Sequence, residues 1–262
     1  MNKYYYLLTC SIMLLSTSLF AQEEPASVYD YNAAFGHGFY TKNGTATRSA
    51  SGKPGHAYWQ NSADYKIDIR LNEDTKQFTG SEVITYTNNS PDVLTYLWVQ
   101  LDQNMRKPGS MTAQSRTSEL PKSITPEQVQ ERYIDQFEGG FVIDGVTGGA
   151  YTIVNTMMRV DLPSPLKPGA SYRFKIDWHY TINNRMTDGG RSGYEHFDEE
   201  NNTLYTIAQF FPRMAVYGDN VGWQHKQFLG QGEFTLPFGD YKVSITVPED
   251  HIVAATGVLT NE

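Results

Sequence analysis

Histidines are the first residues to consider for chemistry, because they serve as metal ligands and as general bases near neutral pH. The chain has six, at His37, His56, His179, His196, His225 and His251. Zinc peptidases place two histidines at the i, i+4 spacing of an HExxH helix, and no pair here has that spacing. His196 begins the run HFDEE, but turn-forming residues flank it, which predicts a solvated acidic loop. The sequence therefore predicts no metal site in this chain; the alternative is a site assembled from histidine and carboxylates that are distant in the sequence.

Nucleophilic catalysis has no better support. The sequence has no GxSxG elbow. The GQGEF run that begins at Gly230 leads into a predicted strand, so it cannot present a helix N-terminus to a phosphate. The single cysteine, Cys10, lies in a predicted leader, which would leave the mature chain without a thiol for catalysis, metal binding or a disulfide. We expect no catalytic residue in this chain.

Residues 1–21 have the layout of a cleavable secretory signal: Lys3, an apolar run up to Phe20, and the small residue Ala21. Serines and threonines interrupt the run, and it is short for a bilayer span. Two alternatives are a retained membrane anchor and a lipid attached to Cys10, although no small residue directly precedes that cysteine. We expect an exported protein, periplasmic or secreted, with no transmembrane segment after signal cleavage.

Charge and composition divide the rest of the chain. The net charge of −8 comes without a basic stripe, which argues against nucleic acid as a partner. Residues 22–60 are rich in glycine, serine, asparagine and threonine and show no period, so we expect a flexible or extended arm. Residues 61–262 are expected to form one β-domain.

Alternating apolar and polar residues predict the strands of that domain. The alternation is strict over 65–71 and over 172–182. Further strands are expected over 78–87, 93–101, 141–146, 152–162, 204–211, 234–248 and 252–258. Short polar turns connect the first three strands, which predicts an antiparallel meander, with a bulge at Gly80. A Pro/Gly turn is expected over 162–172.

One helix is expected among these strands. Thr125, Pro126 and Gln128 have the spacing of a capping box with proline in the first turn, and the apolar residues from Val129 to Phe137 fall near one helical face. Eight or more strands against about one short helix predict an all-β fold, either a β-sandwich or a strongly bent, saddle-shaped antiparallel sheet.

The order of three segments resembles the N-terminal β-domain of the aminopeptidase N-like zinc metallopeptidases, the gluzincins. Residues 65–101 are similar to the opening strands of that domain, with a glycine in the second strand and leucine and tryptophan in the third. Residues 162–183 resemble its Leu-Pro-Gly turn and long alternating strand. TIAQFFPRMAVYGD (206–219), followed by 238–259, is similar to its Thr-Gln-x-Glu region and its Val-Pro strand end. Each motif is weak alone; their order over 64–262 makes the resemblance.

The resemblance implies a non-catalytic domain that caps a catalytic domain carrying HExxH and a Gly-x-Met-Glu-Asn loop. Neither motif occurs in this sequence, so the resemblance implies a truncated N-terminal domain without catalytic or metal-binding residues. Its parent enzyme would use Zn²⁺ in the missing domain to activate water, with a glutamate as general base. The expected partners are that domain and, through it, a peptide substrate.

Two residues are assigned to substrate binding by the resemblance. Gln209 matches the glutamine of Thr-Gln-x-Glu, with Ala208 in place of the threonine, and borders the pocket for the substrate N-terminus. Phe211 stands where the family has a glutamate, and it carries no charge. A preference for a free amine is therefore in doubt. Alternatively, Gln209 is a strand-end amide that satisfies a loop backbone.

A secreted, non-catalytic β-sandwich module for binding or adhesion is the alternative function. In that reading Tyr58, Trp59 and Trp223 form an exposed aromatic platform for a ligand. An HExxH motif downstream in the reading frame supports the peptidase, whereas a stop codon or a repeated sandwich supports the module.

Overall fold

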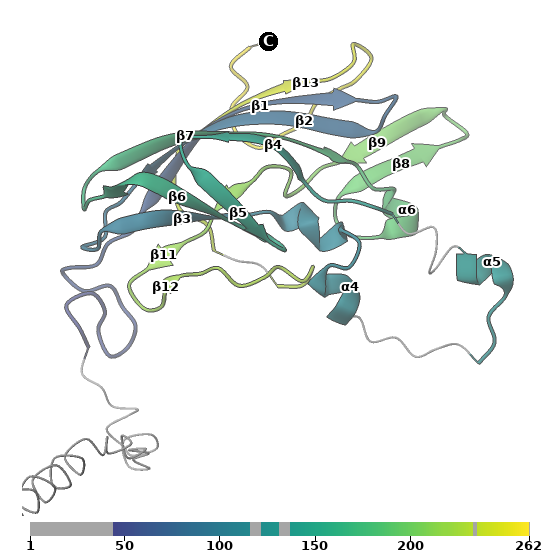
Figure 1. The fold of residues 1–262 in the computed structure, drawn as a ribbon. Helices are drawn as coiled ribbons and strands as arrows, with labels where there is room; N and C mark the ends of the chain where they lie inside the picture. Colours follow the sequence, from purple (N-terminus) through teal and green to yellow (C-terminus); the bar gives the residue numbers. More distant parts are fainter. Residues whose placement is uncertain (1–43, 116–121, 131–136, 233–234, 262) are drawn as a thin grey trace, which may run out of the picture. The chain divides into compact units, whose positions relative to one another are not determined.

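A computed structural model describes residues 44–115, 122–130, 137–232 and 235–261 (Figure 1). The predicted secretory signal and most of the predicted arm lie outside these residues. The chain divides into two compact units, residues 1–57 and 58–262. Of the first unit the structure describes 44–57, where Arg48 and Pro54 form an antiparallel bridge. All further description concerns the second unit.

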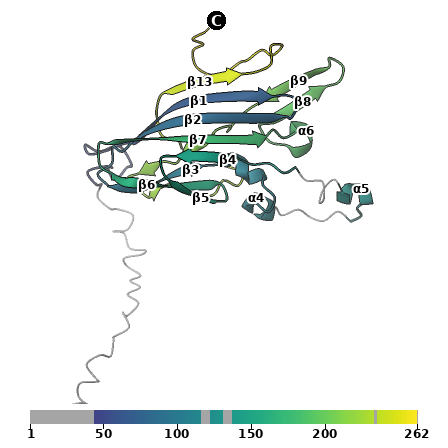
Figure 2. The same cartoon turned by 45° about the horizontal axis from the view of Figure 1, so that its top comes forward.

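The larger sheet of this unit has five strands in the order β13-β1-β2-β7-β4 (Figure 2). Their bounds are β1 Ser62–Asn72, β2 Gln77–Thr87, β4 Val142–Thr147, β7 Ser171–Thr181 and β13 Tyr241–Thr246. The pairs β1–β2, β2–β7 and β4–β7 are antiparallel, whereas β1 and β13 are parallel. Buried and exposed residues alternate along β1 and β2, as the sequence pattern predicts for strands covered on one face.

The smaller sheet has four strands in the order β10-β3-β6-β5. Their bounds are β3 Leu94–Gln100, β5 Ala150–Val154, β6 Met157–Leu166 and β10 Arg213–Met214. The predicted meander of three strands is therefore wrong, because β3 belongs to this second sheet. Since β2 pairs with β1 on one side and β7 on the other, it has no free edge for β3.

The core lies between the facing sides of the sheets. The buried side chains include Ile67 and Ile84 from the larger sheet and Leu97, Val99 and Val160 from the smaller one. Burying one such aliphatic side chain stabilises the fold by about 1.5–3 kcal/mol. The two layers thus meet over an apolar interior, and the all-β, largely antiparallel fold predicted from the sequence is confirmed.

Gly80 serves packing rather than a bulge. The register of β2 with both neighbours runs through Gly80 without a shift, so the predicted bulge is wrong. A Cβ atom at this position would lie 2.3 Å from the Trp178 indole on the paired strand. The indole occupies the space that any larger side chain would need.

Short elements complete the described chain. They are η2 Asp102–Arg106, α4 Met111–Ser115, α5 Pro126–Val129, α6 Arg185–Asp188, β8 Gly193–Phe197, β9 Asn202–Thr206, β11 Tyr217–Gly218 and β12 Gly222–Trp223. The predicted capping box is present, because the Thr125 side chain accepts from the Gln128 backbone N–H and the Gln128 side chain accepts from the Thr125 N–H. Residues 131–136 of the predicted helix lie outside the described residues. Among the described residues, α4, α6 and η2 add to the one expected helix, which begins with α5.

Several predicted segments differ from the structure. The single strand predicted over 152–162 is divided between β5 and β6, and of the strand predicted over 234–248 only β13 forms among the described residues. β6 continues to Leu166, so the Pro/Gly turn is shorter than the predicted 162–172. β9 ends at Thr206, and residues 207–211 are not a strand because Gln209 adopts a left-handed backbone. The segment 252–258 forms no strand, and its Ile252 side chain is 98% exposed.

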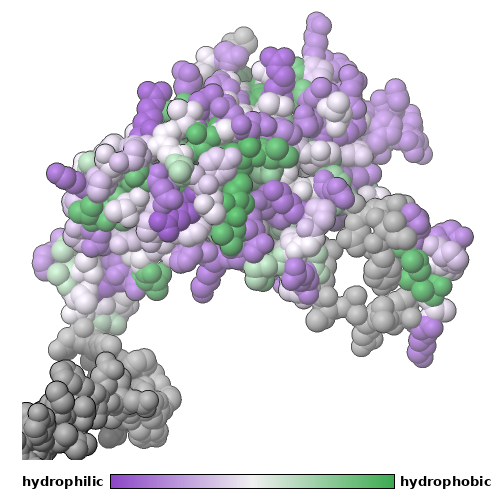
Figure 3. Space-filling view, viewed as in Figure 1, coloured by the Kyte–Doolittle hydropathy of each residue, from purple (hydrophilic) through white to green (hydrophobic). Residues whose placement is uncertain are grey.

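The surface carries apolar residues at strand edges. Tyr151, Ile153 and Val154 of β5 are all exposed, at the edge of the smaller sheet. Figure 3 shows one face of the molecule, mostly hydrophilic, with hydrophobic residues gathered near the middle of the view. Among the described residues no helix is long and apolar enough to cross a membrane.

Candidate functional site

Gln209 lies in the link between β9 and β10, where the backbone is strained. Its φ of 53° is left-handed, which is uncommon for a residue other than glycine. The Gln103 side-chain amide holds this link by donating to the carbonyl oxygens of Ala208 and Gln209, both at 3.1 Å. The Trp178 indole N–H donates to the Phe210 carbonyl at 3.2 Å. Strain of about 1–3 kcal/mol persists where surrounding contacts impose it, and such positions cluster at functional sites.

Gln209 lines a recess of about 180 Å³. We use the name Gln209 recess for the cavity formed by Asp102, Gln103, Met105, Arg106, Gly190, Arg191, Ser192, Gln209, Phe228, Gly230, Gln231 and Gly232. These residues come from the β3–α4 connection, from the loop between α6 and β8, from the β9–β10 link that carries Gln209, and from the chain after β12. Amide, hydroxyl, guanidinium and carboxylate groups meet there, so the recess is suited to the polar main chain of a peptide.

An ion pair closes one wall of the Gln209 recess. Asp102 is 3% exposed, and its Oδ2 atom contacts the Arg213 guanidinium. Its Oδ1 atom is also buried and has no hydrogen-bond partner among the described residues. Because the Asp102 charge is already paired with Arg213, and because Arg106 and Arg191 also line the cavity, the recess has no excess negative charge to attract an ammonium group.

Phe211 lies apart from the recess. Its ring packs edge-on against Tyr65 at 5.6 Å and against Tyr241 at 6.2 Å, between centroids. Tyr65 in turn accepts a hydrogen bond from the Met214 N–H at 2.9 Å. The structure thus places Gln209 in the cavity and Phe211 in the aromatic packing on the inner side of β1 and β13.

Glu82 lies deeper in the same interior. It is 0% exposed, and neither of its carboxyl oxygens has a hydrogen-bond partner in the part of the chain that the structure describes. Burial holds the pKa of the Glu82 carboxyl well above its ordinary value. Burial, followed by the charge of Glu82, raises the pKa of Tyr65. One sequence signal could have found it, because Glu82 falls on the same face of the alternating pattern as Phe78 and Ile84.

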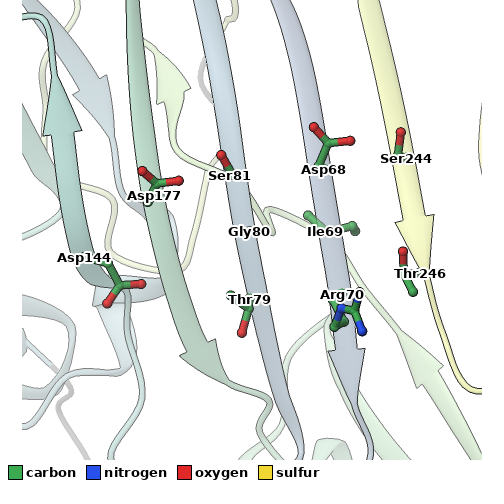
Figure 4. A pocket seen from close by; sticks show the side chains of 10 residues that line it. All are labelled: Asp68, Ile69, Arg70, Thr79, Gly80, Ser81, Asp144, Asp177, Ser244 and Thr246. Atoms are coloured by element: carbon green, nitrogen blue, oxygen red, sulfur yellow. The ribbon is translucent and has the colours of Figure 1, made fainter.

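A second polar region covers the outer face of the larger sheet. Figure 4 shows Asp177, Ser81, Asp68 and Ser244 in a row across β7, β2, β1 and β13, and they line a shallow depression. Burial acts to raise the pKa of Asp177, but hydrogen bonds from Lys175 and Ser81 outweigh it and lower that pKa. Asp68 and Asp177 stand two strands apart, roughly 10 Å, which is too far for direct sharing of a proton. The row is a solvated sheet face rather than an acid–base pair.

The predicted aromatic platform does not form as expected. Trp223 is 9% exposed, and its ring packs against Tyr86 at 6.1 Å and Tyr217 at 5.1 Å. Trp59 stacks on the same Tyr217 at 5.8 Å and, like Tyr58, is half-buried. The prediction of an exposed ligand platform is therefore wrong for Trp223, which belongs to the core.

Two histidine clusters have different settings. His196 lies in strand β8 and not in the predicted loop, and its side chain is 44% exposed, with its Nε2 atom 3.6 Å from Asp198. His251, however, lies within reach of Glu73 and Asp250, and ligand atoms of these three residues lie within 4.8 Å of one another. Sequence reasoning missed this group, because Glu73 and His251 come from opposite ends of the domain.

Comparisons with known proteins give limited matches. No family model matches the chain, and no curated protein matches it. A crystal structure of a two-domain M1 zinc metallopeptidase bound to L-arginine resembles it with a TM-score of 0.40 and 13% identity, over 77% of this chain and 36% of that chain. The M1 zinc metallopeptidase from Deinococcus radiodurans gives the same TM-score and identity, over 79% of this chain and 37% of that one. The chain thus spans little more than a third of these structures, and likeness at this level does not assign it to their family.

Proposed function

We propose that this chain is the N-terminal, non-catalytic β-domain of an exported zinc metallopeptidase of the aminopeptidase N-like type. The order of sequence segments over 64–262 motivates the proposal. The observation that carries it is the Gln209 recess: the residue that the resemblance assigns to substrate binding has a strained backbone, held by Gln103, at the wall of a cavity that polar and apolar side chains line together. A strand-end amide without a binding role needs neither the strain nor the cavity.

The division of labour in the proposed enzyme follows from what the chain lacks. No HExxH motif occurs in the sequence, so residues of this chain do not fit the catalytic zinc. Zinc in a separate catalytic domain would supply an activated water. This chain would position the substrate: the Gln209 side chain and the polar groups of the recess would hold main-chain groups near the peptide N-terminus, and the two sheets would keep them rigid.

The proposed specificity differs from that of a strict aminopeptidase. Such an enzyme needs a carboxylate for the substrate α-ammonium group, and the position expected to supply one is Phe211, which packs against Tyr65. The carboxylate in the recess, Asp102, is paired with Arg213. Leaving a buried charge without its partner costs about 2–5 kcal/mol. We therefore expect weak discrimination between free and blocked peptide N-termini.

Steady-state kinetics on the full-length natural protein test the proposal. We expect zinc-dependent peptidase activity in that protein, and a lower kcat/KM in Gln209→Ala, with unchanged activity in Gln60→Ala, an exposed glutamine outside the recess. Peptidase activity from residues 22–262 alone would contradict the non-catalytic role. Equal kcat/KM in Gln209→Ala and Gln60→Ala would remove Gln209 from the substrate site.

A further inference from the structure

A compact group of metal-binding side chains lies on the domain away from the Gln209 recess. Glu73 lies in the turn between β1 and β2, and Asp250 and His251 follow β13. The His251 Nδ1 atom is 2.9 Å from the Asp250 Oδ1 atom, and its Nε2 atom is 3.8 Å from the Glu73 Oε2 atom. One imidazole therefore spans two carboxylates and uses a different ring nitrogen for each.

Within this group, the Nε2 atom of His251 is the one that lacks a hydrogen bond. It is buried, and it has no hydrogen-bond partner among the residues that the structure describes. The ring packs beside Tyr205, with 5.8 Å between centroids, and its side chain is 17% exposed. When Asp250 accepts the Nδ1 proton, the Nε2 lone pair points at the Glu73 carboxylate. A carboxylate that orients a histidine for its metal is the common outer-shell arrangement of metal sites.

Glu73 is oriented in the same way from its other side. Its Oε1 atom accepts a hydrogen bond from the Tyr205 hydroxyl at 3.3 Å and lies 3.8 Å from the Lys76 Nζ atom. The Oε2 atom is the one that faces His251. One Glu73 oxygen therefore contacts Tyr205 and Lys76, and the other lies beside the Nε2 atom of His251.

The spacing fits a bound cation. Zinc binds nitrogen and oxygen ligands at about 2.0–2.1 Å, so two ligands at a tetrahedral angle are about 3.3 Å apart. The observed 3.8 Å between Nε2 and Oε2 needs only a small closing movement. The two atoms are too far apart for a direct hydrogen bond, and the structure has no hydrogen bond between them.

We propose that His251 Nε2 and Glu73 Oε2, with Asp250 orienting the imidazole through Nδ1, bind a first-row divalent transition metal, with Zn²⁺ as the best match to one nitrogen and one carboxylate and with water as the remaining ligands. This site departs from the expectation that the chain holds no metal, and it is separate from the catalytic zinc of the proposed enzyme. A cation there ties the β1–β2 turn to the segment after β13, whose described residues 249–261 form no strand. Its role is to stabilise the fold.

The competing explanation is a metal-free ion-pair bridge, in which a protonated His251 bridges Asp250 and Glu73. Lys76 separates the two explanations, because its ammonium group pairs with Glu73 and donates to the Tyr205 hydroxyl rather than to His251. Removing that charge should strengthen the binding of a cation. It should have no such effect on a protein that binds no metal.

Isothermal titration of the chelator-treated protein with Zn²⁺ at pH 7.5, together with the visible spectrum of the Co²⁺ complex, tests the proposal. We expect one tight equivalent in wild type, a loss of more than about tenfold in affinity in Glu73→Gln and in His251→Ala, and a gain in Lys76→Met. The His196→Ala variant, which removes an exposed histidine near Asp198, should match wild type. Circular dichroism of each variant establishes that it is folded before titration.

Three results would overturn the site. These are no stoichiometric binding in the folded wild type, equal affinity in wild type and His251→Ala, and weaker binding in Lys76→Met than in wild type. If His196→Ala loses affinity while His251→Ala keeps it, the ion binds at the hairpin and the proposal is wrong. None of these results bears on the peptidase proposal, which Gln209 kinetics test.

Discussion

Two buried carboxylates, Glu82 and Asp102, are treated differently by the surrounding protein. Glu82 is 0% exposed in the intersheet core and has no hydrogen-bond partner among the described residues, and burial raises the pKa of its carboxyl. Asp102 is 3% exposed at the Gln209 recess and contacts the guanidinium of Arg213. An acid in an apolar interior loses its charge, whereas an acid beside a fixed cation can keep it. Near a binding cavity only the second arrangement offers a permanent charge.

The largest expected effect comes from breaking the recess pair. Asp102→Ala leaves the Arg213 side chain, 14% exposed, without the carboxylate it contacts, and loss of one partner of a buried pair costs about 3–5 kcal/mol. Urea unfolding should show this loss. In the double variant Asp102→Ala/Arg213→Met much of the stability should return, because no guanidinium is then buried. If the double variant is as unstable as Asp102→Ala, the loss of stability does not come from the unpaired guanidinium.

A larger side chain at Gly80, in the core near Glu82, should lower the stability of the fold. Gly80→Ala places a methyl group 2.3 Å from the Trp178 ring, and overpacking of this kind costs about 1–3 kcal/mol. Gly145→Ala is the matched control, since a Cβ atom at Gly145 meets nothing within 4 Å. Thermal unfolding should separate the two variants by several degrees. Equal melting temperatures would show that the Trp178 ring moves aside freely.

Titration of Glu82 should make stability depend on pH in a defined direction. Its pKa is raised in the folded state, so its contribution is fully present below the unfolded pKa of about 4.3 and is lost as the pH rises toward the folded pKa. Glu82→Gln removes this loss, so its stability advantage over wild type should grow by about 1.4 kcal/mol per pH unit between those two values. Urea unfolding from pH 5 to 8 measures it, with the exposed Glu199→Gln as control. If the difference in the free energy of unfolding between Glu82→Gln and wild type does not change with pH, the pKa of Glu82 is not raised in the folded protein.

The smallest effect on stability is expected at Gln209, where the backbone is strained and no buried charge is involved. Gln209→Gly relieves a left-handed backbone angle, and we expect a gain of about 1 kcal/mol in the free energy of unfolding. The same variant should lower kcat/KM of the full-length protein, because it removes the side chain from the recess. Stability unchanged in Gln209→Gly and Gln209→Ala alike would show that the angle carries no strain.

Strands with strict alternation could be predicted from the sequence, whereas their partners could not. β1 and β7 follow from the period of two, and β7 was foreseen almost to its ends. Their partners depend on which edges remain open, so the meander failed at β3. The capping box at Thr125 was foreseen because all of its contacts are local.

The candidate site could be foreseen only in part, for the same reason. Gln209 was indicated by its motif, but the recess depends on residues such as Asp102 and Arg191 that come from distant segments. Neither Glu82 nor the Glu73–His251 pair belongs to a local sequence motif. Where a site is assembled by long-range contacts, the sequence can supply a candidate residue but not its surroundings.

The parallel pairing of β1 with β13 also constrains how the domain folds. The first strand of the larger sheet takes its second neighbour from the far end of the domain, and the Asp240 N–H reaches the Asp64 carboxylate across 176 positions. Closing so long a loop gives no contact energy until it is complete, which slows folding. Until residues 241–246 arrive, the backbone groups along one side of β1 are open to pairing with another chain. A chain released before β13 is made should therefore aggregate rather than fold.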